Sequence, residues 1–233
     1  YKKAIAIMPK FAEAHNNLGV ALNEQGNLDK GLESYNLALA LRPNYAEAHE
    51  NLSYSLLKKG MLGKGFDEYE WRWKTPKGLR RKRNFLKPLW DGKASLENKR
   101  ILLWGEQGIG DTINWSSQIP SVASKAKGCS LQCNEKLHAL LRRSFPAIKI
   151  EQEDRKFDNT QGDYDYHLPM GSIYRQCFSD NFIKTNNDAF LIPDPNRIKF
   201  WKKRLNSLGH GPYIGIAWKS SVMTSSRLPN YAP

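Results

Sequence analysis

The stretch from Arg100 to Trp115 carries the side chains with the clearest potential for chemistry. An apolar run leads directly into a glycine-rich loop, whose glycines are Gly105, Gly108 and Gly110. This order is typical of a buried parallel strand, a tight turn and the first turn of a helix. Glycine permits the sharp turn and the close approach of another molecule. Asp111 follows the last glycine, so its carboxylate either caps the helix or faces a cleft and does chemistry.

The elements that must position this loop alternate between strand and helix patterns, as in doubly wound α/β folds. We expect strands near residues 100–104, 130–133, 148–150 and 213–218, and a strand that ends in a functional loop within residues 163–172. We expect helices near residues 111–125, 137–141, 173–177 and 196–208. His167 lies at the end of the fourth strand, where it either packs against its neighbours or contacts a ligand in the cleft. Because one strand cannot bury both its faces alone, the strand at 213–218 predicts a second α/β domain that continues beyond this chain.

The first third of the chain repeats itself at an offset of about 34 residues. Matching residues include Pro9 and Pro43, Leu22 and Leu56, Gly26 and Gly60, Gly31 and Gly65, and Tyr35 and Tyr69. Each unit contains two amphipathic helices with a glycine turn between them, and a proline ends the second helix. The pattern resembles the tetratricopeptide repeat. Such arrays usually present a groove to a peptide or subunit, although so few repeats could instead only buttress the neighbouring domain.

The repeat pattern changes in the sequence EYEWRW, residues 68–73, which predicts a helix that docks against another domain and ends near Thr75 and Pro76. A basic run follows, composed of Lys77, Arg80, Arg81, Lys82 and Arg83. Basic residues near aromatic ones can mark an RNA-binding surface. The segment 85–92 is typical of a connector that packs on a domain surface, and we therefore interpret the basic run as a solvated linker.

Composition narrows the class of protein. The chain has 233 residues, 40% hydrophobic residues and 25% charged residues, which describes an ordinary globular protein. No apolar run reaches the roughly 18 residues that a membrane span needs. The net charge of +13 suits an anionic partner but is also common among bacterial cytoplasmic enzymes. The three cysteines favour reduced, packed thiols, and the histidines show no metal-ligand spacing.

Five segments together resemble bacterial tetratricopeptide-repeat glycosyltransferase-like proteins related to the ADP-heptose:lipopolysaccharide heptosyltransferase family. The segments are YEWRW (69–73), PLWDG (88–92), ILLWGEQGIGDTI (101–113), DYDYHLPMGSI (163–173) and YIGIAWKSS (213–221). The resemblance implies a GT-B architecture, in which two Rossmann-like domains face each other across a cleft. O-linked N-acetylglucosamine transferase combines the same two kinds of module, but none of its specific motifs is present.

The expected fold is α + α/β. It comprises tetratricopeptide repeats at 1–76, a basic linker at 77–99, a Rossmann-like acceptor-side domain at 100–195, and a linking helix with the beginning of a truncated donor domain at 196–233. The chain is thus expected to be a fragment that is inactive by itself.

The resemblance also implies roles for particular residues. The family's acidic residue, proposed as the base that deprotonates the acceptor hydroxyl, corresponds to Asp111; Glu106 is the nearest alternative carboxylate. Around it, Gln107, Gly108, Gly110 and His167 would line the acceptor side. The donor diphosphate would be held by Lys219, Ser220, Ser221 and Arg227, although the family often carries Gly-Asn where this chain has two serines. No metal or other cofactor is implied.

Two functions of different classes remain open. The chain is either part of a glycosyltransferase that uses a nucleotide-sugar donor, or a protein-interaction scaffold whose transferase-like domain is not catalytic. Both include a protein or peptide partner in the repeat groove and a cytoplasmic location. Nucleic acid is a less favoured partner, supported only by the net charge and the basic run.

Overall fold

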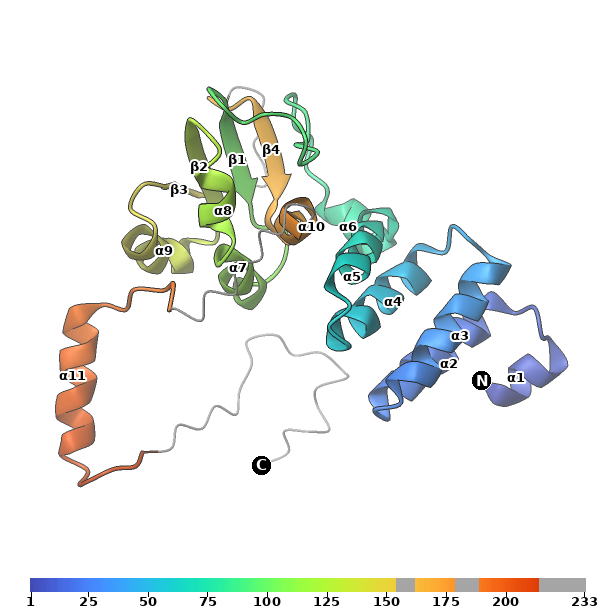
Figure 1. Ribbon diagram of the computed structural model, residues 1–233. Coiled ribbons are helices and arrows are strands. Elements are labelled where there is room, and N and C mark those ends of the chain that lie inside the picture. The colour runs from blue at the N-terminus through green and yellow to red at the C-terminus, as the bar shows by residue number, and fades with distance from the viewer. Residues whose placement is uncertain (154–161, 179–188, 214–233) are drawn as a thin grey trace. The chain divides into compact units, whose positions relative to one another are not determined.

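The computed structural model describes residues 1–153, 162–178 and 189–213 (Figure 1). The chain divides into two compact units, 1–192 and 193–233. The first unit contains both the repeats and a parallel sheet. In the second unit the described helix is α11 (Pro195–Asn206), whose first turn is capped by the Asp194 carboxylate.

The repeat region consists of paired antiparallel helices. The helices are α1 (Lys2–Ile7), α2 (Ala12–Glu24), α3 (Leu28–Leu41), α4 (Ala46–Lys58) and α5 (Leu62–Tyr69). In Figure 1, α2 lies along α3 and α4 lies along α5. Gly26 and Gly60 follow α2 and α4 with φ of 81° and 75°, a conformation that favours glycine. The predicted helical pairs with glycine turns are therefore confirmed.

The close approach of α2 and α3 depends on Gly19, which faces the large side chain of Tyr35. Tyr35 is 1% exposed and lies against Gly19, where a Cβ would come within 2.6 Å of the tyrosine ring. Tyr35 also packs with Leu52 and Leu56 of α4, which joins the two helical pairs into one core. The Asn51 amide donates to Asn16 Oδ1 at 3.0 Å across the same interface.

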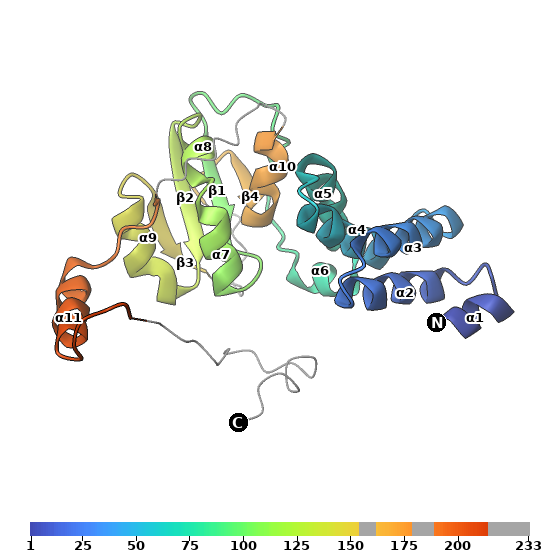
Figure 2. The same ribbon diagram turned by 60° about the horizontal axis from the view of Figure 1, so that its bottom comes forward.

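The sheet has four parallel strands in the order β3-β2-β1-β4. The strands are β1 (Arg100–Trp104), β2 (Gly128–Cys133), β3 (Lys149–Gln152) and β4 (Tyr166–Pro169). The helices packed on them are α7 (Ile109–Ser116), α8 (Ile119–Ala123), α9 (His138–Ser144) and α10 (Ile173–Phe178), with short turns η2 (Glu135–Leu137) and η3 (Met170–Ser172). Figures 1 and 2 show α7 to α10 on one face of the sheet. Ile101 and Leu103 point toward this layer and are 0% exposed.

The helix predicted over 111–125 is instead two helices. The first begins at Ile109, two residues earlier than expected, and ends at Ser116. The second begins at Ile119 and has Pro120 in its first turn. Proline has no backbone N–H to donate to the carbonyl four residues earlier and its ring clashes with that carbonyl, so a helix is kinked or broken at this position, and here it is broken.

The segment 77–99, predicted as a basic linker, begins in a helix, and Lys77, Arg80 and Lys82 of its basic run are exposed. This helix is α6 (Pro76–Arg81), where the Thr75 hydroxyl accepts from the Gly78 amide at 3.1 Å. Further along, Trp90 is 2% exposed, and its backbone N–H donates to His167 O at 2.9 Å. The segment therefore extends along β4 as a packed connector, because the indole and the free edge of β4 both gain partners there.

Candidate functional site

The carboxyl end of β1 lies where the strand order of the sheet reverses. The chain runs from β1 to β2 to β3 in one direction, and β4 then adds to the opposite side of β1. In open parallel sheets, ligands usually bind in the crevice that forms at such a reversal. Here the crevice is bordered by the glycine loop after β1 and by η3 after β4.

A buried arginine from the end of the repeats lies in this crevice, between the glycine loop and η3. Arg72 belongs to η1 (Glu70–Lys74), the helical turn that follows α5. Its Nε donates to Glu106 Oε1 at 2.8 Å and its Nη2 to Glu106 Oε2 at 3.2 Å. The two side chains are 4% and 1% exposed. This two-point ion pair attaches the repeats to the glycine loop.

Further polar groups complete the network around Arg72. Its Nη2 donates to Ser172 Oγ at 2.8 Å and its Nη1 to Glu70 Oε1 at 2.7 Å. Ser172 in turn donates to Glu70 at 2.7 Å. The network thus joins η1, the glycine loop and η3, three segments that are far apart in the sequence.

Two opposing effects set the pKa values of Glu106 and Arg72: burial favours the neutral form of each group, and their mutual attraction favours the charged form. Burial raises the pKa of Glu106 to about 6, although Arg72 acts in the opposite direction. Burial lowers the pKa of Arg72, but Glu106 and Glu70 together raise it above its ordinary value. The Arg72–Glu106 pair is therefore charged on both sides at neutral pH.

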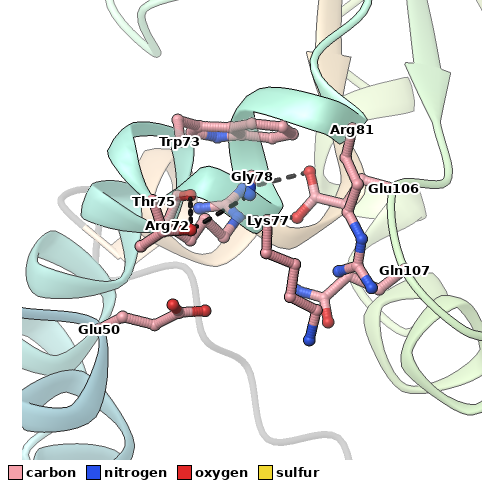
Figure 3. A pocket seen from close by; sticks show the side chains of 9 residues that line it. All are labelled: Glu50, Arg72, Trp73, Thr75, Lys77, Gly78, Arg81, Glu106 and Gln107. Atoms are coloured by element: carbon pink, nitrogen blue, oxygen red, sulfur yellow. Dashed lines mark hydrogen bonds and ion pairs between the residues drawn. The ribbon is translucent and has the colours of Figure 1, made fainter. Parts of the chain in front are cut away.

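The remaining space beside the pair is too small for a substrate. Figure 3 shows the residues around it: Glu50, Arg72, Trp73, Thr75, Lys77, Gly78, Arg81, Glu106 and Gln107. The cavity measures about 10 Å³, roughly the space for one water molecule. Glu106, the alternative carboxylate for the base, is committed to Arg72 and buried, so it is poorly placed to meet an acceptor.

Asp111 is exposed and forms a helix cap. Its Oδ2 accepts from the Gly108 amide at 3.0 Å, and Gly108 is the N-cap residue of α7. Of the two sequence-based alternatives for Asp111, the cap is thus present in the structure. A cap through one oxygen leaves the role of base open as a prediction.

The other residues of the glycine loop differ in how much room they leave. Gln107 donates its amide to the Tyr69 hydroxyl and so adds a second tie to the repeats. A Cβ at Gly110 would meet nothing within 4 Å, whereas a Cβ at Gly108 would lie 3.2 Å from Asp111. The outer part of the loop is consequently open at Gly110.

Two glycine substitutions are expected to differ sharply. A Cβ at Gly78 would lie 1.7 Å from the Arg72 carbonyl oxygen, so Gly78→Ala must displace α6 from η1. We expect a loss of about 1–3 kcal/mol in the free energy of unfolding, measured by urea denaturation. The matched control Gly110→Ala should be neutral or stabilising by up to about 1 kcal/mol, because the helix position is open. Equal effects of the two changes would contradict this packing.

His167 is the second of the four residues of β4 and is in register with Leu102. It therefore does not stand at the carboxyl end of the strand, where the sequence placed it. The Trp104 indole donates to its Nδ1 at 3.2 Å, and the Phe85 ring stacks on it at 4.0 Å. Burial, with the nearby Arg83 guanidinium, lowers its pKa to about 4. These contacts are those of the packing alternative; contact with an acceptor remains a prediction.

We expect His167 to stay neutral when acid is added below pH 6. Because its pKa of about 4 is below the ordinary value of 6.5, the folded state binds fewer protons than the unfolded state between these values. Its contribution to stability therefore falls as the pH is lowered from 6.5 to 4. Histidine NMR titration, with His167→Gln to assign the signal, would check this; an apparent pKa near 6.5 would contradict it.

The predicted donor residues Lys219, Ser220, Ser221 and Arg227 lie outside the described residues, as does most of the strand predicted at 213–218. Among the residues that are described, no His, Cys, Asp and Glu side chains gather in a group of three that could hold a metal ion. In that same part of the chain, no helix is long and apolar enough to cross a membrane.

Comparison with known proteins assigns part of the helical region to a family. Residues 12–45 match the tetratricopeptide repeat family, so this segment is such a repeat. The chain is 31% identical over 161 residues to Protein FlbA of Caulobacter vibrioides. This match covers 62% of this chain and 26% of FlbA. The chain thus spans about a quarter of the length of this curated relative.

Two solved structures show more distant similarity. The crystal structure of MamA is 20% identical with a TM-score of 0.31, and the match covers 35% of this chain and 47% of MamA. A mutant of the Thermobaculum terrenum O-GlcNAc transferase is 20% identical with a TM-score of 0.33, and the match covers 68% of this chain and 31% of the transferase.

Proposed function

We propose that this chain is part of a glycosyltransferase of GT-B architecture that uses a nucleotide-sugar donor. The observation that carries the proposal is the glycine loop, with exposed Asp111, at the reversal of strand order in a parallel sheet. Ligand sites in such sheets favour this position. The five family-like segments noted in the sequence add support, since two of them form this loop and the adjoining η3 turn.

In this proposal one group of residues acts on the acceptor and a second group binds the donor, on opposite sides of a cleft. Asp111 deprotonates the acceptor hydroxyl, and Gln107, Gly108 and Gly110 border the acceptor. Lys219, Ser220, Ser221 and Arg227 hold the diphosphate that leaves with the nucleotide. In this proposal the two cations balance the developing charge and the two hydroxyls donate hydrogen bonds to it, in place of a metal ion.

The repeats would bind a protein or peptide partner, and the protein would act in the cytoplasm. Arg72 and Tyr69, at the end of the last helical pair, contact Glu106 and Gln107 directly. A partner held by the repeats would therefore lie on a module fixed to the acceptor side of the cleft.

A second candidate is a protein-interaction scaffold with a non-catalytic transferase-like domain. Two observations favour it: Arg72 occupies the crevice at the strand reversal, and Asp111 has a structural role as a helix cap. In this case the sheet would serve mainly to anchor the repeats.

The experiment is a transfer assay with the natural protein that contains this segment. A panel of nucleotide-sugars would be incubated with the protein and its cell extract, and release of the nucleoside diphosphate measured with and without a metal chelator. Turnover that survives the chelator supports the proposal. No release from any donor, together with retained capture of a partner by the repeats, would support the scaffold instead.

A further inference from the structure

Four consecutive cations, Arg80 to Arg83, lie at the carboxyl end of β1. They line a pocket of about 90 Å³, much larger than the space beside the Arg72–Glu106 pair. The other residues of this pocket are Trp104, Gly105, Glu106 and Glu153. The volume would hold several water molecules, or a group of the size of a phosphate.

The charge around this pocket is positive. Two carboxylates line it, but Glu106 is already paired with Arg72, which is itself buried. The four cations therefore outnumber the negative charge that the pocket walls provide. A group with more than one negative charge would gain most from entering it.

One of the arginines, Arg83, is held in place before any ligand arrives. Arg81 is half-buried and lines both this pocket and the smaller cavity beside the Arg72–Glu106 pair. Arg83 donates to Gln132 Oε1 at 2.7 Å, and its guanidinium lies 4.9 Å from the centre of the Phe85 ring. A guanidinium that is already ordered loses less entropy on binding and matches the geometry of phosphate oxygens.

We propose that this pocket binds the phosphate group of a small ligand. The position agrees with the carboxyl edge of a parallel sheet, where phosphorylated ligands commonly bind. The source of the phosphate rests on the proposed function: it belongs either to a phosphorylated acceptor or to the nucleotide-sugar donor, and in the second case the pocket acts in place of the diphosphate contacts proposed for Lys219, Ser220, Ser221 and Arg227. The chemistry of the site is the same in both cases.

The surroundings argue against single-stranded RNA as the ligand. Such binding relies on aromatic faces on which successive bases stack. Here Trp104 is 3% exposed, and Phe85 is stacked on His167, so both rings are already engaged by the protein. The aromatic residue that lines the pocket, Trp104, is therefore unavailable for stacking on a base.

The test is calorimetric titration of the 233-residue chain with inorganic pyrophosphate. In Arg80→Gln/Lys82→Gln we expect affinity to fall about tenfold or more, because two cations at the pocket are lost. The matched control is Lys58→Gln/Lys64→Gln, which removes two exposed cations from the repeats. The control should change affinity by less than about twofold at physiological salt. Equal losses in the two variants would show attraction by net charge alone and overturn the proposal.

Further titrations separate the sources of the phosphate. A nucleoside diphosphate that binds tighter than pyrophosphate, and depends on Arg80 and Lys82, assigns the pocket to the donor. A sugar phosphate that does so assigns it to the acceptor. Tighter binding of an oligouridylate, lost in the same variant, would overturn the proposal in favour of RNA. Absence of pyrophosphate binding at low salt would also overturn the phosphate-site proposal. The proposed function is tested separately, by the transfer assay.

Discussion

Replacing Arg72 by methionine is expected to lower the free energy of unfolding by about 3–5 kcal/mol, because the buried Glu106 carboxylate loses its partner and must either bear an uncompensated charge or take up a proton. The Glu106 side chain is 1% exposed, so water cannot replace the two hydrogen bonds from the guanidinium. Ser172 and Glu70 would lose a donor as well. The substitution would weaken the contact between the repeats and the glycine loop, because Arg72 and Glu106 form that contact.

The size of this loss should depend on pH. Glu106 has a pKa of about 6 in the folded chain, above its ordinary value of 4.5, so stability falls as the pH rises through this window. Arg72 opposes the upward shift, and without it the pKa of Glu106 rises further. The difference between the variant and the natural chain should therefore be larger at pH 8 than at pH 5.

Urea denaturation at these two pH values measures both effects. The matched control is Arg42→Met, which breaks an ion pair with Glu13 whose side chains are 44% and 43% exposed. Such an exposed pair is worth at most about 1 kcal/mol. The double variant Arg72→Met/Glu106→Gln should recover part of the loss and most of the pH dependence. If Arg72→Met costs no more than the control, the network does not hold the two modules together.

The repeats could be predicted from the sequence because their information is local and occurs twice. Gly26 and Gly60 recur in equivalent positions, and each adopts the positive φ that ends its helix. Tyr35 fits against Gly19 within one helical pair. A pattern of this kind needs no knowledge of distant residues. The strand and the glycine loop from Arg100 onward were predictable because their pattern is also local, although the helix after them is divided near Pro120.

The buried ion pair could not be predicted in this way. Arg72 stands in a segment in which tryptophans alternate with charge, and a charged residue in such a pattern is normally exposed. Its partners Glu106 and Ser172 are distant in the sequence and belong to two different loops. Only the reversal of strand order brings those loops together. The packing of the connector 85–92 was indicated by its sequence, whereas its position could not be, since Trp90 meets the edge of β4 only after the sheet has formed.

Asp111→Asn in the natural protein is expected to reduce sugar transfer by about 10²–10⁴-fold, because an amide cannot accept the proton of the acceptor hydroxyl. The fold should be retained. An asparagine oxygen can still accept from the Gly108 amide, which now donates to Asp111 Oδ2 at 3.0 Å. The substitution therefore removes the base and preserves the cap.

Asp111→Ala provides the contrast, because it removes both functions. It should lose activity as Asp111→Asn does and also lower the free energy of unfolding by about 0.5–2 kcal/mol, as loss of a helix cap does. Initial transfer rates and thermal unfolding of both variants would separate the two roles. Near-normal turnover in Asp111→Asn, with destabilisation confined to Asp111→Ala, would mean that Asp111 only caps α7. The base would then have to come from another residue, and Glu106 is unsuitable because Arg72 holds it inside the protein.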